Sequence, residues 1–426
     1  AHNENEIIDA VESAKSVTNK PTLIISKSTI GKYSPNKENT SGVHGSPLGE
    51  KEFELFLENI GFSGDPFIHD SEIYSYFEEK RANDNLNYDE WKANLESKLQ
   101  SDKNFSQLWN QFNNFETREV ELEWSSDEAT RVVGGKILNQ YGSSNKFIIG
   151  GSADLAASTK QIISDNTFGS NNFGGNSIEF GIREHAMGGI VNGLALHSNL
   201  LPYGSTFLVF SDYMRPSMRL ASLMNVNSLF IFTHDSIYLG EDGPTHQPIE
   251  HLMSLRLIPN LDVIRPSNSM ELIHSYRYAL EKKDNPKAII LSRQNMKFFD
   301  NDVSYKDFQK GAYEFMPGKD ITLVATGSEL ELAVEISKNL KDLSVQIISA
   351  PILNKINKKM IGSLNLNQNI FTLELGRSTG WDSYIENITR SFSIDSFGES
   401  APIEALTERF SFSAKKISDE IRSLLN

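Results

Sequence analysis

Cysteine is absent from this sequence of 426 residues. Its absence excludes disulfide bonds, zinc or iron–sulfur sites with cysteine ligands, and a thiolate nucleophile. Long apolar runs are also absent, because no stretch approaches the roughly 20 residues that a transmembrane helix needs. The first residues, Ala1 to Glu4, are polar and acidic and do not resemble a signal peptide. We therefore expect a cytoplasmic protein that does not bind membranes.

Positive charge is scarce. The sequence holds 41 Lys and Arg against 56 Asp and Glu, which gives a net charge of −15. Such a chain has no global electrostatic attraction for nucleic acid, although a local basic pocket is compatible with it. Internal repeats and low-complexity tracts are absent too. At this length one hydrophobic core is not enough, and we expect two or three domains.

The N-terminal part of the sequence is polar and irregular. Its periodicity predicts a helix over Glu6–Ala14 and a short strand over Pro21–Ser26. A loop rich in Gly, Ser, Pro and Asn follows over Gly31–Gly49. Residues 50–124 are dense in Asn, Ser, Asp and Glu, which is typical of a surface or interdomain connection. Helical periodicity appears there in pieces such as Ser71–Lys80 and Tyr88–Leu99.

From about Asp127 the pattern changes to alternating helices and strands, and a second such unit begins near Ile321. An amphipathic helix over Ala414–Leu425 ends the sequence. We predict an α/β fold with two successive open, mainly parallel sheets flanked by helices. The strands expected in the first sheet are Phe147–Ile149, Ser177–Phe180, Leu229–Thr233, Leu261–Ile264 and Ala288–Ser292.

Polar residues follow four of these strands. Ligands of open parallel sheets bind beyond the carboxyl ends of the strands, so these residues are the first candidates for a site. They are Asp154, the run Gly181–Glu184, the pair His234–Asp235 and the run Arg293–Asn295.

Glu184 stands where a strand turns into a helix, and that helix carries Gly188, Gly189 and Gly193. Small residues let another backbone pack closely, so the carboxyl group could be half-buried at a domain or subunit interface. Burial raises the pKa of a carboxyl group and suits it to proton transfer, whereas the helix N-terminus favours its anion. The alternative is a helix-terminal charge paired with Arg183.

Four aromatic residues, Tyr203, Phe207, Phe210 and Tyr213, recur at spacings of four, three and three. These spacings place them along one face of a helix. They are consistent with core packing, and also with a platform on which a flat heteroaromatic ring stacks.

The segment from Thr233 to Pro248 places two histidines and three acids in a loop held by Gly and Pro. A mononuclear metal site of His234, Asp242 and His246 is one interpretation. Because no His-x-x-x-His helix is present, we favour polar recognition of substrate hydroxyls over a metal. A solvated loop is the third alternative.

Three further residues, Arg131, Ser158 and Arg293, lie at element edges near the expected crevice. The guanidinium fork suits phosphate oxygens, and an acidic protein that binds an anionic substrate needs local positive groups. Taken singly, each is equally consistent with a surface ion pair or a turn.

In this order the motifs resemble those of transketolase, the thiamine diphosphate enzyme of the pentose phosphate pathway. The resemblance spans nearly the whole sequence, and the run Gly240–Pro248 is highly specific. The motifs that carry it are Gly150–Leu155, Gly181–Gly188, Ser205–Phe207, His234–Ser236, Gly240–Pro248, Ser292–Asn295, Ala325–Glu329 and Phe397–Pro402.

The resemblance implies roles for individual residues. Glu184 matches the glutamate that hydrogen-bonds the aminopyrimidine ring of the cofactor. Catalytic roles fall to Glu184, His246 and His44. Cofactor-binding roles fall to Asp154, Leu155, Glu184, Phe207, Phe210 and Tyr213. Substrate-binding roles fall to His44, Arg131, Ser158, His234, Asp242, His246 and Arg293. None of these is implied to bind a metal.

One departure concerns the diphosphate. The family holds it, with Mg²⁺ or Ca²⁺, through a Gly-Asp-Gly motif that this sequence lacks. The sequence therefore resembles the C-terminal two-thirds of a transketolase, as a truncated form, a proteolytic product or one subunit of a split enzyme. The implied domains are a remnant of the diphosphate-binding α/β domain with connecting helices (1–120), the pyrimidine-binding domain (121–308) and the C-terminal domain (309–426).

The resemblance also implies partners. We expect sugar phosphate substrates, a homodimer and no activity of this chain alone. A separate N-terminal polypeptide is a further candidate partner, for the case that the chain is one subunit of a split enzyme. Dihydroxyacetone synthase, which shares the reaction type, is the closest alternative, and deoxyxylulose phosphate synthase is a more distant one. From another class, the chain could be a noncatalytic subunit that uses the same folds for assembly.

Overall fold

The computed structural model describes residues 2–114, 120, 127–164, 166–281, 284–297, 299 and 303–425. The chain forms two compact units, Ala1–Ser101 and Asp102–Asn426. The expected limit between the first two domains, at residues 120 and 121, falls in a stretch where only residue 120 is described. Within the described residues, no helix is both long and apolar enough to cross a membrane.

The first unit consists of helices joined by loops. Asn3 caps the first helix by accepting hydrogen bonds from two backbone N–H groups. The predicted strand over Pro21–Ser26 was wrong: this segment pairs with no strand, and Leu23 and Ile25 are 84% and 78% exposed. The helices are α1 (Glu4–Ser16), the 3₁₀ helix η1 (Ser41–Val43), α2 (Glu50–Asn59) and α3 (Ser71–Ser101).

The first sheet of the second unit is parallel throughout, with strand order β2-β3-β4-β6-β5. Both faces are covered, as alternate residues of β4 demonstrate. Phe230 and Phe232 belong to the core beside α7 and α8, and Ile231 belongs to the core beside α5 and α10. The strands are β2 (Ile148–Ser152), β3 (Leu201–Phe207), β4 (Leu229–Thr233), β5 (Asp262–Ile264) and β6 (Lys287–Leu291).

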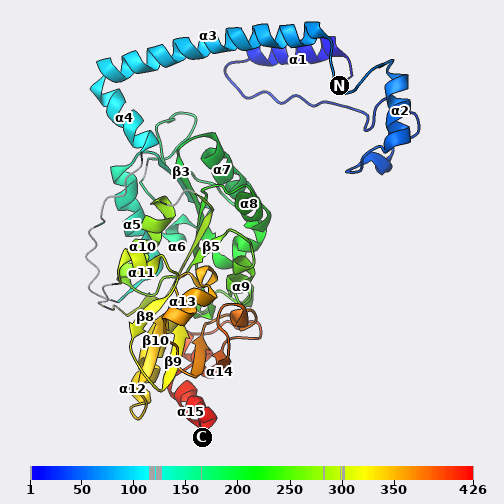
Figure 1. The fold of residues 1–426 in the computed structure, drawn as a ribbon. Coiled ribbons are helices and arrows are strands. Elements are labelled where there is room, and N and C mark those ends of the chain that lie inside the picture. Colours follow the sequence, from blue (N-terminus) through cyan, green and yellow to red (C-terminus); the bar gives the residue numbers. More distant parts are fainter. Residues whose placement is uncertain are drawn as a thin grey trace. The chain divides into compact units, whose positions relative to one another are not determined.

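Helices α7 and α8 lie on one side of this sheet, and α5 and α10 lie on the other (Figure 1). A short antiparallel pair, β1 (Glu128–Ala129) with β7 (Asn295–Met296), lies outside the sheet. The helices of this part are α4 (Lys103–Asn113), α5 (Thr130–Ser144), α6 (Ala156–Thr159), α7 (Glu184–His197), α8 (Ser211–Leu223), α9 (His251–Arg256), α10 (Ser269–Glu281) and α11 (Tyr305–Phe308), with the 3₁₀ helices η2 (Leu208–Phe210), η3 (Ile237–Leu239) and η4 (Pro244–His246).

A second sheet follows, with strand order β12-β11-β9-β10-β8, in which only the pairing of β8 is antiparallel. The prediction of two successive, mainly parallel sheets is thereby confirmed. The elements are β8 (Tyr313–Met316), β9 (Ile321–Ala325), α12 (Glu329–Asn339), β10 (Val345–Ser349), η5 (Leu353–Lys355), α13 (Lys358–Ser363), β11 (Asn369–Leu373), η6 (Trp381–Ser383), β12 (Ile388–Phe392), α14 (Ile403–Arg409) and α15 (Ala414–Leu425).

Two local predictions need correction. Ser177–Phe180 is not a regular strand: it runs beside β2 with a few backbone hydrogen bonds and an isolated bridge at Ser177. The aromatic residues are not on one helix either. Tyr203 and Phe207 lie on strand β3, Phe210 ends η2, and Tyr213 is on α8.

The two sheets are joined through buried charges. Arg265, fully buried after β5, donates to Asp235 after β4 and to Glu329 at the start of α12. Arg256 of α9 forms a bidentate pair with Glu374, at 2.7 and 2.8 Å. The Arg265–Glu329 and Arg256–Glu374 pairs cross from the first sheet region to the second and hold the two sheets together.

Candidate functional site

A cavity of about 760 Å³ opens at the carboxyl edge of the first sheet. It brings together residues that the sequence separates by up to 92 positions, because parallel strands end at one edge. Residues predicted for the site that line it are Asp154, Leu155, Glu184, Phe210, Tyr213 and His246.

Glu184 is the first residue of α7 and is 9% exposed. Gly181, at φ +69°, makes the turn that directs the chain into this helix. The Arg183 guanidinium donates to the carbonyl of Phe180 at 3.0 Å. No ion pair of Arg183 with Glu184 occurs among the described residues, and Glu184 lines the cavity.

Phe210 and Tyr213 form one wall of the cavity, and the buried ring of Phe207 stacks on Phe210 without lining the cavity. The rings of Phe207 and Phe210 are nearly parallel with centroids 5.8 Å apart, and Phe210 and Tyr213 follow at 6.0 Å. The His246 imidazole meets Phe210 edge-on at 5.5 Å. Tyr213 is 65% exposed. The stack of rings therefore has a buried end and an open end.

His234 lies behind this wall. Its ring stacks on Phe207 with centroids 3.6 Å apart, and its Nδ1 is 2.8 Å from the Thr233 hydroxyl. Burial, followed by the positive charges of Arg131 and Arg293, lowers the pKa of His234 to about 3. The imidazole is therefore neutral at physiological pH and able to exchange hydrogen bonds with a hydroxyl group.

Arg131 and Arg293 line a second cavity, of about 590 Å³. Arg131 donates to the backbone carbonyl of Ser158, so the two meet through the main chain. Burial and the neighbouring Arg293 lower the pKa of Arg131, and Asp242 acts in the opposite direction. The Arg131 and Arg293 guanidinium groups are close enough to affect each other electrostatically. They make a local positive region in an acidic protein, which suits an anionic ligand.

The metal site considered for His234, Asp242 and His246 finds no support. Asp242 is exposed, and the Nδ1 atom of His246 faces the Thr245 hydroxyl at 3.1 Å. Among the described residues, the one group of three His, Asp or Glu side chains close enough to share an ion is a different one, Asp212, Glu250 and His251.

His44 lies in the first unit, as the exposed residue that ends η1. Its backbone N–H donates to the Ser41 carbonyl at 3.1 Å. Its predicted role at the substrate stays a prediction.

Several lining residues received no individual role from the sequence, although Ile182 and Arg183 belong to the candidate run Gly181–Glu184. Ile182, Arg183, His185 and Ala186 line the first cavity beside Glu184. Tyr238, Ser328 and Glu331 line the cavity that contains the two arginines. The available signal was adjacency in the chain, since the first four surround Glu184 and Ser328 lies in the run Ala325–Glu329.

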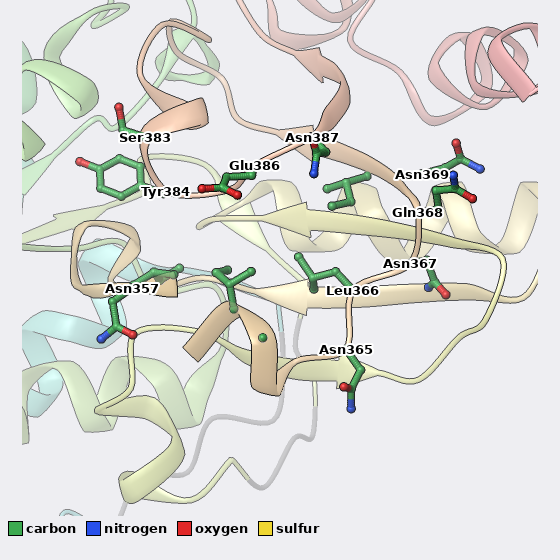
Figure 2. A pocket seen from close by; sticks show the side chains of 14 residues that line it. Asn357, Asn365, Leu366, Asn367, Gln368, Asn369, Ser383, Tyr384, Glu386 and Asn387 are labelled. Atoms are coloured by element: carbon green, nitrogen blue, oxygen red, sulfur yellow. The ribbon is translucent and has the colours of Figure 1, made fainter. Parts of the chain in front are cut away.

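A third cavity, of about 790 Å³, lies in the second sheet region and contains none of the predicted residues (Figure 2). Asparagine and glutamine side chains dominate its polar lining, among them Asn357, Asn365 and Asn387. These amides carry no charge and do not titrate near neutral pH. The chemistry of acids, bases and cations is concentrated at the first sheet.

Three family models match consecutive parts of the chain. They are the transketolase thiamine diphosphate binding domain over residues 1–116, the transketolase pyrimidine binding domain over 127–298 and the transketolase-like C-terminal domain over 311–413. The first cavity, which contains Glu184, lies entirely within the match to the pyrimidine binding domain.

Curated relatives agree. A transketolase from Staphylococcus aureus is 38% identical over 98% of this chain and 66% of its own length. A transketolase from Bacillus subtilis is 36% identical over 100% of this chain and 67% of its own length. The chain thus spans about two thirds of the length of the curated relatives it matches.

Solved structures give the same result. A Pichia stipitis transketolase in complex with sedoheptulose-7-phosphate has a TM-score of 0.91 at 30% identity, covering 99% of this chain and 65% of that one. A split gene transketolase, described as an inactive β4 tetramer, has a TM-score of 0.59 at 27% identity, covering 70% of this chain and 98% of that one. With matches at this level along its whole length, the chain belongs to the transketolase family.

Proposed function

We propose that this chain supplies the pyrimidine half of a transketolase active site. The reaction is transfer of a two-carbon ketol unit from a ketose phosphate to an aldose phosphate, as in the pentose phosphate pathway. The observation that carries the proposal is the cavity in which Glu184, an aromatic wall and His246 meet, next to the pair Arg131 and Arg293.

The cavity fits the pyrimidine half of thiamine diphosphate. A flat heteroaromatic ring needs a stacking surface, which Phe210 and Tyr213 offer, and a partner for its ring nitrogen, which the nearly buried Glu184 offers. When bound, this cofactor supplies a carbon centre that stabilises a carbanion. Glu184 would hold a proton at the pyrimidine nitrogen, while Asp154 and Leu155 border the ring.

The sugar would extend from the aromatic wall toward the two arginines. His246 lies at the wall, and the neutral imidazole of His234 lies behind Phe207. Both imidazoles and Asp242 would hydrogen-bond sugar hydroxyls. Arg131, Arg293 and the Ser158 segment would bind the phosphate, which suits guanidinium groups.

Residues 1–116 match the transketolase thiamine diphosphate binding domain, but the motif expected to hold the diphosphate is missing. The sequence has no Gly-Asp-Gly motif. Within the first unit, the described residues include only two buried ones, Ser34 and Glu52, both polar, while Phe67 is 88% exposed. A unit that buries so little apolar surface lacks the driving force to hold a ligand site by itself.

We therefore propose that a separate polypeptide covers the first unit and contributes the diphosphate and Mg²⁺ ligands. The likeness to a subunit of a split gene transketolase supports this arrangement. His44 would join the site from the first unit. The family's subunit arrangement is the reason for also proposing a homodimer, and its place in central sugar metabolism is the reason for proposing a cytoplasmic location.

Reconstitution tests the proposal. The purified chain is assayed with xylulose 5-phosphate and ribose 5-phosphate, thiamine diphosphate and Mg²⁺, with and without a polypeptide that carries the Gly-Asp-Gly part of a transketolase. We expect activity only in the mixture. Turnover by the chain alone would refute the need for a partner, and a mixture that binds cofactor without turnover would refute the activity.

In the reconstituted enzyme, Glu184→Gln should lower kcat by about 100- to 10,000-fold, the range typical of a lost proton-transfer group. An amide cannot hold a proton for the ring nitrogen as a carboxylate does. Glu179→Gln is the matched control, since Glu179 is exposed on the segment that leads to the same turn. Equal activity of the two variants would rule out the role given to Glu184.

A further inference from the structure

We propose that Asp212, Glu250 and His251 form a binding site for a divalent transition-metal cation of the Zn²⁺ class. One donor atom from each of the three lies within 4.8 Å of the others. The site is outside the cavity of the proposed function and is separate from the ion that accompanies the diphosphate. It does not depend on transketolase activity.

The histidine carries the proposal. The His251 side chain is 5% exposed, yet among the described residues neither of its ring nitrogens has a hydrogen-bond partner. Buried polar atoms are nearly always partnered, so an unsatisfied pair calls for a missing ligand. A cation accepts the lone pair of one imidazole nitrogen and removes that deficit.

The two carboxylates approach different ring nitrogens of His251, and one donor atom from each of the three residues lies within 4.8 Å of the others. The Asp212 Oδ2 atom is 3.2 Å from His251 Nε2 but lies off the N–H axis, since no hydrogen bond forms there. Glu250 Oε2 is 4.0 Å from Nδ1. Donors about 2.1 Å from a Zn²⁺ ion lie about 3.4 Å from each other in tetrahedral coordination. An ion held by Nε2 and Asp212 therefore requires the exposed Glu250 side chain to turn from Nδ1 toward Nε2.

The donor types select the ion. One imidazole and two carboxylates, with no cysteine in the chain, suit Zn²⁺, Co²⁺ or Ni²⁺, whereas Mg²⁺ prefers oxygen donors alone. The carboxylate side chains of Asp212 and Glu250 are 57% and 55% exposed. An ion can therefore enter from solvent without opening the core.

The position of the site suggests a bracing role. Asp212 directly precedes Tyr213 of the aromatic wall, on α8, while Glu250 and His251 follow the loop that carries His246. Helices α8 and α9 already contact each other through Arg215 and the Ser254 carbonyl, at 3.2 Å. An ion shared by both would tie the wall to the histidine loop.

Metal binding to the full chain tests the site directly. The purified chain is treated with a chelator, and Zn²⁺ is titrated by calorimetry while Co²⁺ is titrated by visible absorption. We expect one ion per chain and a Co²⁺ spectrum of low coordination number. His251→Gln should weaken Zn²⁺ binding by more than about 100-fold. Loss of a group that only hydrogen-bonds a metal ligand typically lowers metal affinity by about 10- to 100-fold, and loss of the ligand itself should lower it further.

Two variants guard against misfolding and adventitious binding. Asp212→Asn changes an exposed side chain and should weaken Zn²⁺ binding while the circular dichroism spectrum is unchanged. His197→Gln replaces an exposed histidine on α7 and should leave binding unchanged. Zn²⁺ should raise the Tm of the wild-type chain but not of Asp212→Asn. Absence of binding, or equal binding by all variants, would overturn the proposal and leave an ordinary His–Asp pair.

Discussion

His234 adopts a backbone conformation that its residue type seldom takes. Its φ of +62° lies in the left-handed region, where a side chain with a Cβ is strained. Asp235, the next residue, is held by two hydrogen bonds from Arg265, at 2.7 and 3.1 Å. The strain is therefore sustained by a buried anchor, and it turns the imidazole onto Phe207.

The depressed pKa of His234 makes stability depend on pH. The imidazole titrates near 6.5 when unfolded and near 3 when folded, so the unfolded chain binds the proton more tightly. Stability is then full above pH 6.5 and falls as the pH drops toward 3. The free energy of unfolding should therefore decrease less between pH 7 and pH 4.5 in His234→Gln than in the wild-type chain, by about 2.5 kcal/mol. Urea unfolding at the two pH values measures this difference.

The exposed His197 provides the comparison for that measurement. His197→Gln should keep the wild-type pH profile between 4.5 and 7. Parallel profiles for the wild-type chain and His234→Gln would mean that His234 is readily protonated in the folded state.

At Arg293 the expected effect concerns substrate binding. Arg293→Ala in the reconstituted enzyme should raise KM for phosphorylated substrates by about 10- to 100-fold, the worth of one charge-assisted hydrogen bond, with a small change in kcat. Steady-state kinetics with a phosphorylated and an unphosphorylated acceptor measure this. Equal losses toward both would contradict a phosphate role for Arg293.

The sequence was informative about individual residues where a motif and a strand end coincided. Asp154, Glu184 and His246 were predicted and line one cavity. Arg265 and Glu329 were not predicted as a pair, since 64 positions separate them and only the packing of two sheets brings them together. Burial of a charge network leaves no periodic signal in a sequence.

At the scale of single elements, the contact of α7 with α8 depends on one glycine. A Cβ at Gly188 would lie 2.8 Å from both Met214 and Ser217 of α8, whereas a Cβ at Gly189 would meet nothing within 4 Å. A larger residue would therefore clash with α8 at position 188 but not at position 189. Of the two glycines, only Gly188 is needed for the close packing of α7 on α8.

Alanine substitutions separate these reasons. Gly188→Ala should destabilise the second unit by about 1–3 kcal/mol, the usual effect of overpacking. Gly189→Ala should be neutral or stabilise by up to about 1 kcal/mol, because alanine is the better helix former. Urea unfolding followed by circular dichroism measures both. Equal destabilisation would refute the packing account.

Elements were predictable where one periodicity acted alone. Ala414–Leu425 was predicted as a helix and β4 as a strand, with the observed limits. Strand β3 was missed because all seven of its residues are buried and include Pro202, Gly204 and Ser205, so no alternation was visible. Its aromatic residues continued into η2 and α8 at spacings that imitate a helix.

At the scale of the molecule, the buried charges between the sheets make the second unit cooperative. Glu329 is 1% exposed and receives the Arg265 guanidinium, and its Oε2 also accepts the N–H of Leu375 at 3.2 Å. Gly327, at φ +53°, leaves room for this arginine, since a Cβ there would lie 2.6 Å from its Nε. Removing one charge would leave the other buried without full compensation.

Glu329→Gln should accordingly destabilise the second unit by about 3–5 kcal/mol. Glu331→Gln, on the same helix, removes a half-exposed pair with Lys297 at 2.8 Å and should cost less than about 1 kcal/mol. Calorimetry of the full chain measures both and shows whether the two sheets still unfold together. A two-step transition is expected for Glu329→Gln alone.

The division of the chain into units was only partly readable. The alternation of helices and strands predicted both sheets, because it reports burial within each sheet. The long helix α3 was predicted only as two helical pieces, Ser71–Lys80 and Tyr88–Leu99, within a polar connection, since its 31 residues bury no side chain and leave no apolar stripe.

That helix has a consequence for how the chain tolerates change. No side chain of α3 is buried, and within it only Leu95 and Leu99 are half-buried. Elsewhere in the helix, nearly any substitution that keeps good helix formers should be silent in the isolated protein. A mutational scan of the chain alone would score this stretch as expendable. If a partner covers α3, the same scan in the assembled complex would identify the α3 residues that contact the partner. Natural selection would then act on α3 through its binding surface and not through the stability of the chain.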